Sequence, residues 1–180
     1  DDAIVIGTVA VFRFQKRLDK WLEVMKECTD KNPNIYGIII GAGILEPQLK
    51  EKQALLNLES KVFFAGLQTQ VRPYYEAMDI FMMSSSFEGL PIALLEAMSM
   101  ECAIVTTDAG GIKEVIRNEQ DGVVVGVEEW AQLSTHLIAL KNQPSRLATL
   151  QKAARLRANA SFSMDAMIKT LEQLYQHYHQ

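Results

Sequence analysis

Short runs of hydrophobic residues alternate along this chain with longer segments in which hydrophobic positions recur at helical spacing. The short runs predict buried β-strands, and the periodic segments predict amphipathic helices. The runs predict strands over residues 4–11, 36–40, 62–64, 80–83, 103–106 and 122–125. The periodic segments predict helices over residues 18–30, 45–58, 70–77, 91–98, 111–116, 130–140, 144–158 and 164–178.

Short buried strands separated by helices predict one parallel sheet with helices on both faces. This is a doubly wound, Rossmann-like α/β fold, which the last three predicted helices extend at its C-terminal end. No internal repeat, low-complexity tract or linker divides the sequence, so residues 1–180 are predicted to form one domain. The first predicted strand starts almost at the first residue, and we therefore expect a preceding domain to be missing from this chain.

The composition is that of an ordinary globular protein, with 48% hydrophobic and 22% charged residues. A formal net charge of −4 argues against a nucleic-acid-binding protein, which needs an extended basic surface. No hydrophobic run reaches the roughly 20 residues that span a bilayer, and the N-terminus does not resemble a signal peptide. Cys28 and Cys102 lie far apart and without metal-ligand spacing, which favours a reduced, cytoplasmic chain without a metal site.

In such a sheet, ligands bind beyond the carboxyl ends of the strands, where the strand order reverses. The most distinctive loop there is Ser-Ser-Ser-Phe-Glu-Gly-Leu-Pro at residues 84–91, which leads into a predicted helix. Glu88 precedes the free N–H groups of that helix, which attract anions, and Gly89 allows a ligand to approach the backbone. Glu96 lies among hydrophobic residues, so we expect a buried carboxylate that needs hydrogen-bond donors. Either both carboxylates bind sugar hydroxyls, or Glu88 caps the helix while Glu96 pairs with a lysine or a loop amide.

Three cations, Arg13, Lys16 and Arg17, follow the first predicted strand. They either neutralise a diphosphate or form a solvated turn. Gly41-Ala42-Gly43 follows the second strand but lacks the third glycine of a dinucleotide fingerprint, and no acid ends that strand, which disfavours an NAD site.

Two further loops have structural as well as functional interpretations. Gly110-Gly111 with Glu114 is typical of a tight strand-to-helix turn, with the carboxylate near the positive end of the helix dipole. The segment from Phe64 to Leu67 either lies beside a nucleotide base or simply ends a strand.

The Glu-x7-Glu element from Glu88 to Glu96, with its neighbours, resembles the retaining glycosyltransferases of family 4. It is similar to their C-terminal, donor-binding domain in the two-domain GT-B arrangement. Supporting segments occur in the same order over nearly the whole chain, at residues 13–16, 41–43, 62–66, 74–79, 110–114 and 121–122.

The resemblance implies a role for each of these residues. Glu88 is expected to bond hydroxyls of the donor sugar, with the amides of Gly89 and Leu90 near the sugar or phosphates, and Glu96 to bond the ribose hydroxyls. Arg13 and Lys16 are expected to bind the diphosphate and to stabilise the negative charge of the leaving group. Gly43 is expected to line the phosphate side of the site, and Gly66 and Leu67 to contact the base. No metal or cofactor is implied.

The cationic pair departs from the family pattern. Family members often carry Gly-Arg-Leu and Lys-Gly, whereas this chain has Phe12-Arg13-Phe14 and Lys16-Arg17, with a shorter gap between the two cations. Arg17 is then a second phosphate contact or a solvated side chain.

The resemblance further implies transfer of a sugar from a UDP-, GDP- or ADP-linked donor to an acceptor, in cell-surface polysaccharide or glycoconjugate biosynthesis. The acceptor-binding N-terminal domain is missing, so we expect the isolated chain to be inactive or nearly so. Membrane contact, peripheral and at the inner face, is expected only through that domain. The last predicted helix resembles a segment that packs against the N-terminal domain, which predicts exposure of Met167, Leu171 and Leu174.

The alternatives to a sugar transferase are a non-catalytic nucleotide-binding module and a sugar-nucleotide epimerase.

Overall fold

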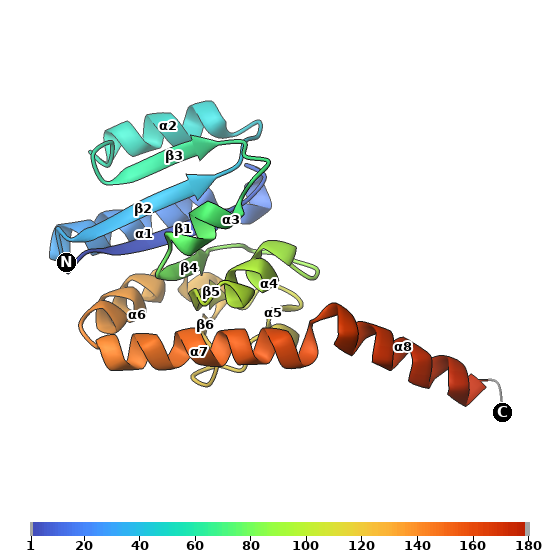
Figure 1. Ribbon diagram of the computed structural model, residues 1–180. Helices are drawn as coiled ribbons and strands as arrows, with labels where there is room; N and C mark the ends of the chain where they lie inside the picture. The colour runs from blue at the N-terminus through green and yellow to red at the C-terminus, as the bar shows by residue number, and fades with distance from the viewer. Residues whose placement is uncertain (1, 179–180) are drawn as a thin grey trace.

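The computed structural model describes residues 2–178 and contains a six-stranded parallel sheet with helices on both faces (Figure 1). The strands are β1 (Ile4–Val9), β2 (Ile35–Ile40), β3 (Val62–Gly66), β4 (Ile80–Met83), β5 (Ala103–Thr107) and β6 (Val123–Val125). They lie in the order β3-β2-β1-β4-β5-β6, and each neighbouring pair is parallel. The predicted doubly wound sheet is therefore confirmed.

Each predicted helix is present, with ends shifted by up to three residues. The helices are α1 (Leu18–Lys31), α2 (Glu46–Leu55), α3 (Arg72–Glu76), α4 (Ile92–Ser99), α5 (Ile112–Val115), α6 (Gln132–Lys141), α7 (Pro144–Ser161) and α8 (Met164–Tyr178). Two short 3-10 helices, η1 (Phe14–Lys16) and η2 (Val127–Glu129), were not predicted.

The prediction that the first strand continues to Val11 was wrong. β1 ends at Val9 because the chain then turns, and the N–H of Phe12 donates to the carbonyl of Ala42 at 2.9 Å. Phe12 is buried, while Val11 is exposed. A hydrophobic run can thus leave a strand and still fill the core.

The core has one hydrophobic cluster on each side of the sheet. One cluster holds side chains of α1, α2 and α6, and the other holds side chains of α3, α4 and α5. α7 contributes to both, with Leu147 and Leu150 in the first and Ala154 and Ala158 in the second. The sheet is therefore buried on both faces, as its continuous hydrophobic strands require.

Both cysteine thiols are buried in these clusters. Burial raises the pKa of the Cys28 thiol and of the Cys102 thiol to about 12 each. Because only the thiolate reacts readily, we expect neither cysteine to react with a chromogenic disulfide reagent at pH 8 in the folded chain. Both should react once the chain is unfolded in urea. Rapid labelling of the folded chain would contradict this burial.

α8 extends away from the rest of the domain (Figure 1). Its hydrophobic face is exposed, as predicted, with exposed fractions of 51% for Met167, 43% for Leu171 and 52% for Leu174. Between residues 2 and 178, no helix combines the length and the hydrophobicity that a membrane span requires.

Candidate functional site

The strand order reverses between β1 and β4. From β1 the chain adds β2 and β3 on one side, and then crosses to place β4 and β5 on the other. The crevice beyond the carboxyl ends of β1 and β4 is therefore the expected ligand site of this fold.

Two adjoining hollows occupy this crevice. The first, the switch-point cavity, has a volume of about 60 Å³ and is lined by Thr8, Val9, Ala10, Lys16, Leu18, Met83, Ser84, Ser85, Pro91, Ile92 and Ala93. The second, the adjoining groove, has a volume of about 300 Å³ and is lined by Val9, Ala10, Val11, Lys16, Ile40, Gly41, Ala42, Leu67, Gln68, Val71 and Ala93. Lys16 and Ala93 line both hollows, so a single elongated ligand can contact both.

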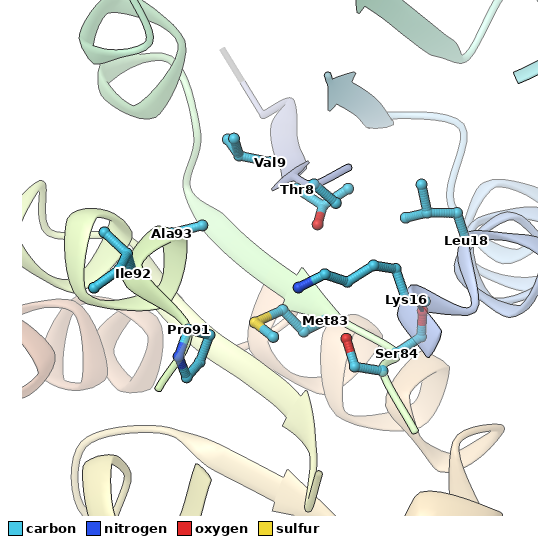
Figure 2. A pocket seen from close by; sticks show the side chains of 11 residues that line it. Thr8, Val9, Lys16, Leu18, Met83, Ser84, Pro91, Ile92 and Ala93 are labelled. Atoms are coloured by element: carbon cyan, nitrogen blue, oxygen red, sulfur yellow. Dashed lines mark hydrogen bonds between the residues drawn. The ribbon is translucent and has the colours of Figure 1, made fainter. Parts of the chain in front are cut away.

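Lys16 and Glu88 form an ion pair at this crevice, although they lie 72 residues apart in the sequence. The Lys16 ammonium donates to Glu88 Oε1 at 2.7 Å and to Oε2 at 2.8 Å. The Ser85 hydroxyl donates to Glu88 Oε1 at 2.6 Å. Figure 2 shows the Lys16 side chain extending across the switch-point cavity toward the side where Pro91 and Ile92 lead into α4.

The burial of the two partners differs. Glu88 is 8% exposed, whereas the Lys16 side chain is 23% exposed. The pair therefore holds a negative charge within the protein and leaves part of its positive partner accessible from the crevice. The alternative in which Glu88 caps the helix was wrong, because no side-chain hydrogen bond caps the described first turn of α4.

Hydrogen bonds to backbone carbonyls hold the loop that carries Glu88 against the loop that carries Lys16. The Ser86 N–H donates to the Gln15 carbonyl at 2.8 Å, and the Ser84 hydroxyl donates to the Arg17 carbonyl at 2.9 Å. On the other side, the Thr107 hydroxyl donates to the Ser85 carbonyl at 2.6 Å. The ion pair thus joins two loops whose backbones are already held together.

The glycine pair after β5 also supports this loop, which the sequence did not indicate. Gly110 has a φ of +64°, and a Cβ at this position would overlap the carbonyl oxygen of Glu88. A Cβ on Gly111 would lie 2.7 Å from the carbonyl oxygen of Gly89. The two glycines therefore let the backbone of residues 88–89 pack closely against them, and they also form the turn into α5.

Replacing Gly110 by alanine is expected to lower the free energy of unfolding by about 1–3 kcal/mol, the usual cost of backbone strain. Gly89→Ala is the matched control, because no atom lies within 4 Å of a Cβ built there; its effect should stay within about 0.5 kcal/mol. Urea denaturation measures both. An equal loss of unfolding free energy in both variants would show that the close contact between Gly110 and the Glu88 loop does not contribute to stability.

Glu96 is exposed, so the prediction of a buried carboxylate was wrong. The buried face of α4 consists of Leu94, Ala97 and Met98, and Glu96 points away from it. Its partner is neither a lysine nor a loop amide, because the Tyr75 hydroxyl donates to Glu96 Oε2 at 2.8 Å. Glu96 lies one turn beyond Ala93 on α4, and Ala93 lines both hollows.

The other two cations after β1 have different environments. The Arg13 side chain is exposed, just before η1. Arg17 donates to the Val127 carbonyl at 3.1 Å and lies 3.9 Å from the Glu128 carboxylate. The interpretation of Arg17 as a solvated side chain was wrong, because the side chain is 17% exposed and connects this loop to η2. Its alternative role as a phosphate contact stays a prediction.

The remaining predicted donor contacts are spread along the crevice. Leu67 lines the adjoining groove and directly follows Gly66 at the end of β3. Gly89 and Leu90 are exposed in the loop after Glu88. Gly43 lines neither hollow, and a Cβ there would lie 2.6 Å from the backbone of Phe12, so close packing requires a glycine at this position. Its contact with the phosphates stays a prediction.

Among residues 2–178, no group of three or more His, Cys, Asp or Glu side chains is placed to hold a metal ion. The charged residue that lines both hollows is Lys16, and Glu88 is its ion-pair partner.

Residues 1–159 match the family described as "Glycosyl transferases group 1". The lipopolysaccharide core biosynthesis mannosyltransferase LpsB of Rhizobium meliloti is 24% identical over 178 residues, which are 95% of this chain and 51% of LpsB. The lipopolysaccharide core biosynthesis glycosyltransferase LpsE of the same organism is 29% identical over 150 residues, which are 82% of this chain and 43% of LpsE. This chain thus spans about half the length of these relatives.

Solved structures share the fold. HepE of Anabaena, in complex with UDP and glucose, superposes with a TM-score of 0.88 at 19% identity, over 98% of this chain and 49% of HepE. The C-terminal domain of the group 1 glycosyl transferase LpcC from Francisella tularensis superposes with a TM-score of 0.82 at 22% identity, over 89% of this chain and 87% of that domain. The architecture is therefore that of the C-terminal domain of GT-B glycosyltransferases.

Proposed function

The chain belongs to the group 1 glycosyl transferases, and we propose that it is the donor-binding half of a retaining, family 4 enzyme. The observation that carries the proposal is the meeting of Lys16 and Glu88 at the point where the strand order reverses. A cation and an anion side by side suit a ligand that carries both phosphates and hydroxyls. A nucleoside-diphosphate sugar is such a ligand.

In this proposal the donor lies along the crevice from β3 to α4. The base rests in the adjoining groove near Gly66 and Leu67, and the ribose hydroxyls bond Glu96. Lys16 binds the diphosphate, and Arg13, exposed beside it, adds a second positive charge. The complex of HepE with UDP and glucose supports a nucleotide ligand for this fold, and UDP-, GDP- and ADP-linked sugars are the donors to test.

The chemistry assigned to the chain is electrostatic. As the bond between the sugar and the diphosphate breaks, negative charge collects on the diphosphate, and Lys16 and Arg13 stabilise it. Glu88 bonds sugar hydroxyls and holds the reacting carbon in place, while the amides of Gly89 and Leu90 bind sugar or phosphate oxygens. Because these side chains supply the charge, we expect no metal ion to be required.

We expect a further, N-terminal domain in the complete protein, since the chain spans about half of its relatives. That domain supplies the acceptor site and covers the exposed hydrophobic face of α8. In its absence the chain binds donor weakly and transfers little or no sugar. The names of LpsB and LpsE support a role in lipopolysaccharide or related surface polysaccharide synthesis, with the enzyme in the cytoplasm and at the inner face of the membrane.

The proposal is tested by incubating the full-length protein with labelled nucleotide sugars and a panel of acceptors. We expect acceptor-dependent release of the nucleoside diphosphate and a glycoside that keeps the anomeric configuration of the donor, as measured by NMR. An inverted product contradicts the retaining mechanism. Donor binding without transfer supports the non-catalytic module, and an isomerised nucleotide sugar supports an epimerase.

A further inference from the structure

Tyr75 is a buried tyrosine whose hydroxyl reaches the edge of the crevice. It lies on α3, is 1% exposed, and belongs to the hydrophobic cluster shared by α3, α4 and α5. Its ring centroid lies 6.0 Å from that of Phe81 on β4. Core packing therefore holds the ring, and a buried hydroxyl needs a polar partner.

That partner is the carboxylate of Glu96, which accepts the Tyr75 hydroxyl proton at 2.8 Å. The carbonyl of Ala93, one turn earlier on α4, lies 3.3 Å from the same hydroxyl. Burial, followed by the bond to Glu96, raises the pKa of the Tyr75 hydroxyl far above its usual range. Tyr75 therefore keeps its proton at any working pH and always acts as a donor.

The bond fixes a side chain that would otherwise move freely. Glu96 is exposed on α4, and an exposed glutamate has many rotamers whose loss on binding costs free energy. The hydroxyl engages Oε2 from the protein side and leaves Oε1 for a ligand. α3 directly follows Val71, which lines the adjoining groove. The same segment of the chain therefore lines the groove and orients the Glu96 carboxylate through Tyr75.

We propose that Tyr75 is a positioning residue that orients Glu96 toward the two hydroxyls of a ribose, so that preference for a ribonucleotide depends on it. The inference rests on the proposed function, which assigns ribose binding to Glu96. A tyrosine that served packing alone would affect every nucleotide equally, whatever its sugar.

The experiment uses Tyr75→Phe, which removes one oxygen atom and leaves no buried polar group unpaired, because Glu96 is exposed. Calorimetry on the full-length protein compares the tightest-binding of UDP, GDP and ADP with its 2′,3′-dideoxy analogue. We expect Tyr75→Phe to weaken the ribonucleotide about three- to tenfold, the effect of releasing one side chain, and to leave the dideoxy analogue unchanged. In a Glu96→Ala background, Tyr75→Phe should have no further effect.

Tyr74→Phe is the matched control, because Tyr74 is the partly buried neighbour of Tyr75 on the same helix; it should change neither affinity. Urea denaturation checks that each variant folds. Equal weakening of both ligands by Tyr75→Phe would overturn the inference and leave Tyr75 a packing residue. A wild type that binds both ligands equally well would overturn the ribose role of Glu96, and a wild type that binds neither would overturn the donor site itself.

Discussion

Replacing Lys16 by alanine is expected to lower the affinity for a nucleoside diphosphate by a factor of about 10–100, since a hydrogen bond to a charged group contributes about 1.5–3 kcal/mol. The same substitution leaves Glu88, which is 8% exposed, without its cationic partner. Breaking such a pair is destabilising, by about 1–3 kcal/mol here because Lys16 is partly exposed. Calorimetry measures the first effect and urea denaturation the second.

The double variant Lys16→Ala/Glu88→Gln separates the two effects. It removes both charges, so it should recover most of the lost stability while nucleotide binding stays weak. Lys20→Ala is the control: Lys20 pairs with Glu23 on α1 and does not line either hollow, so its removal should leave nucleotide affinity unchanged. Full recovery of binding in the double variant would mean that Lys16 acts only by neutralising Glu88.

Replacing Glu88 by glutamine should lower the transfer rate of the full-length protein by a factor of about 100–1,000, the usual effect of removing one electrostatic contact to a transition state. Binding of a nucleoside diphosphate without a sugar should not weaken, because the substitution frees Lys16 from its partner. Steady-state kinetics with a nucleotide sugar, and calorimetry with the bare nucleotide, measure the two quantities.

The control for this prediction is Glu114→Gln, which changes an exposed acid on α5 and should affect neither quantity. If Glu88→Gln weakened the bare nucleotide as much as it slowed transfer, Glu88 would act through the shape of its loop. Contact with the donor sugar would then no longer explain its effect.

The sheet could be predicted because its strands are buried on both faces and therefore appear as continuous hydrophobic runs. The alternation of these runs with helices also predicted a ligand site beyond the carboxyl ends of the strands, but only the structure shows that the strand order reverses between β1 and β4. The exposure of Glu96 could not be predicted, because its helix is hydrophobic nearly all round. Only packing decided that Leu94, Ala97 and Met98 face the core.

The contacts of the site depend on loop conformations that no local pattern encodes. Lys16 meets Glu88 because the Ser86 N–H and the Ser84 hydroxyl of one loop donate to backbone carbonyls of the other. Arg17 binds Val127 because the chain returns beside it after β6. Tyr75 carried one usable signal, since a tyrosine that packs into the core must find a partner for its hydroxyl. That signal did not identify the partner as Glu96.

The most direct test of the central claim is calorimetric titration of this chain and of the full-length protein with UDP, GDP and ADP, with and without a chelator. We predict that one nucleotide binds, that the chelator has no effect, and that both Lys16→Ala and Glu96→Ala weaken binding at least about tenfold. Nucleotide affinity that survives both substitutions, or a full-length protein that binds none of the three, would contradict the assignment of the crevice as a donor site.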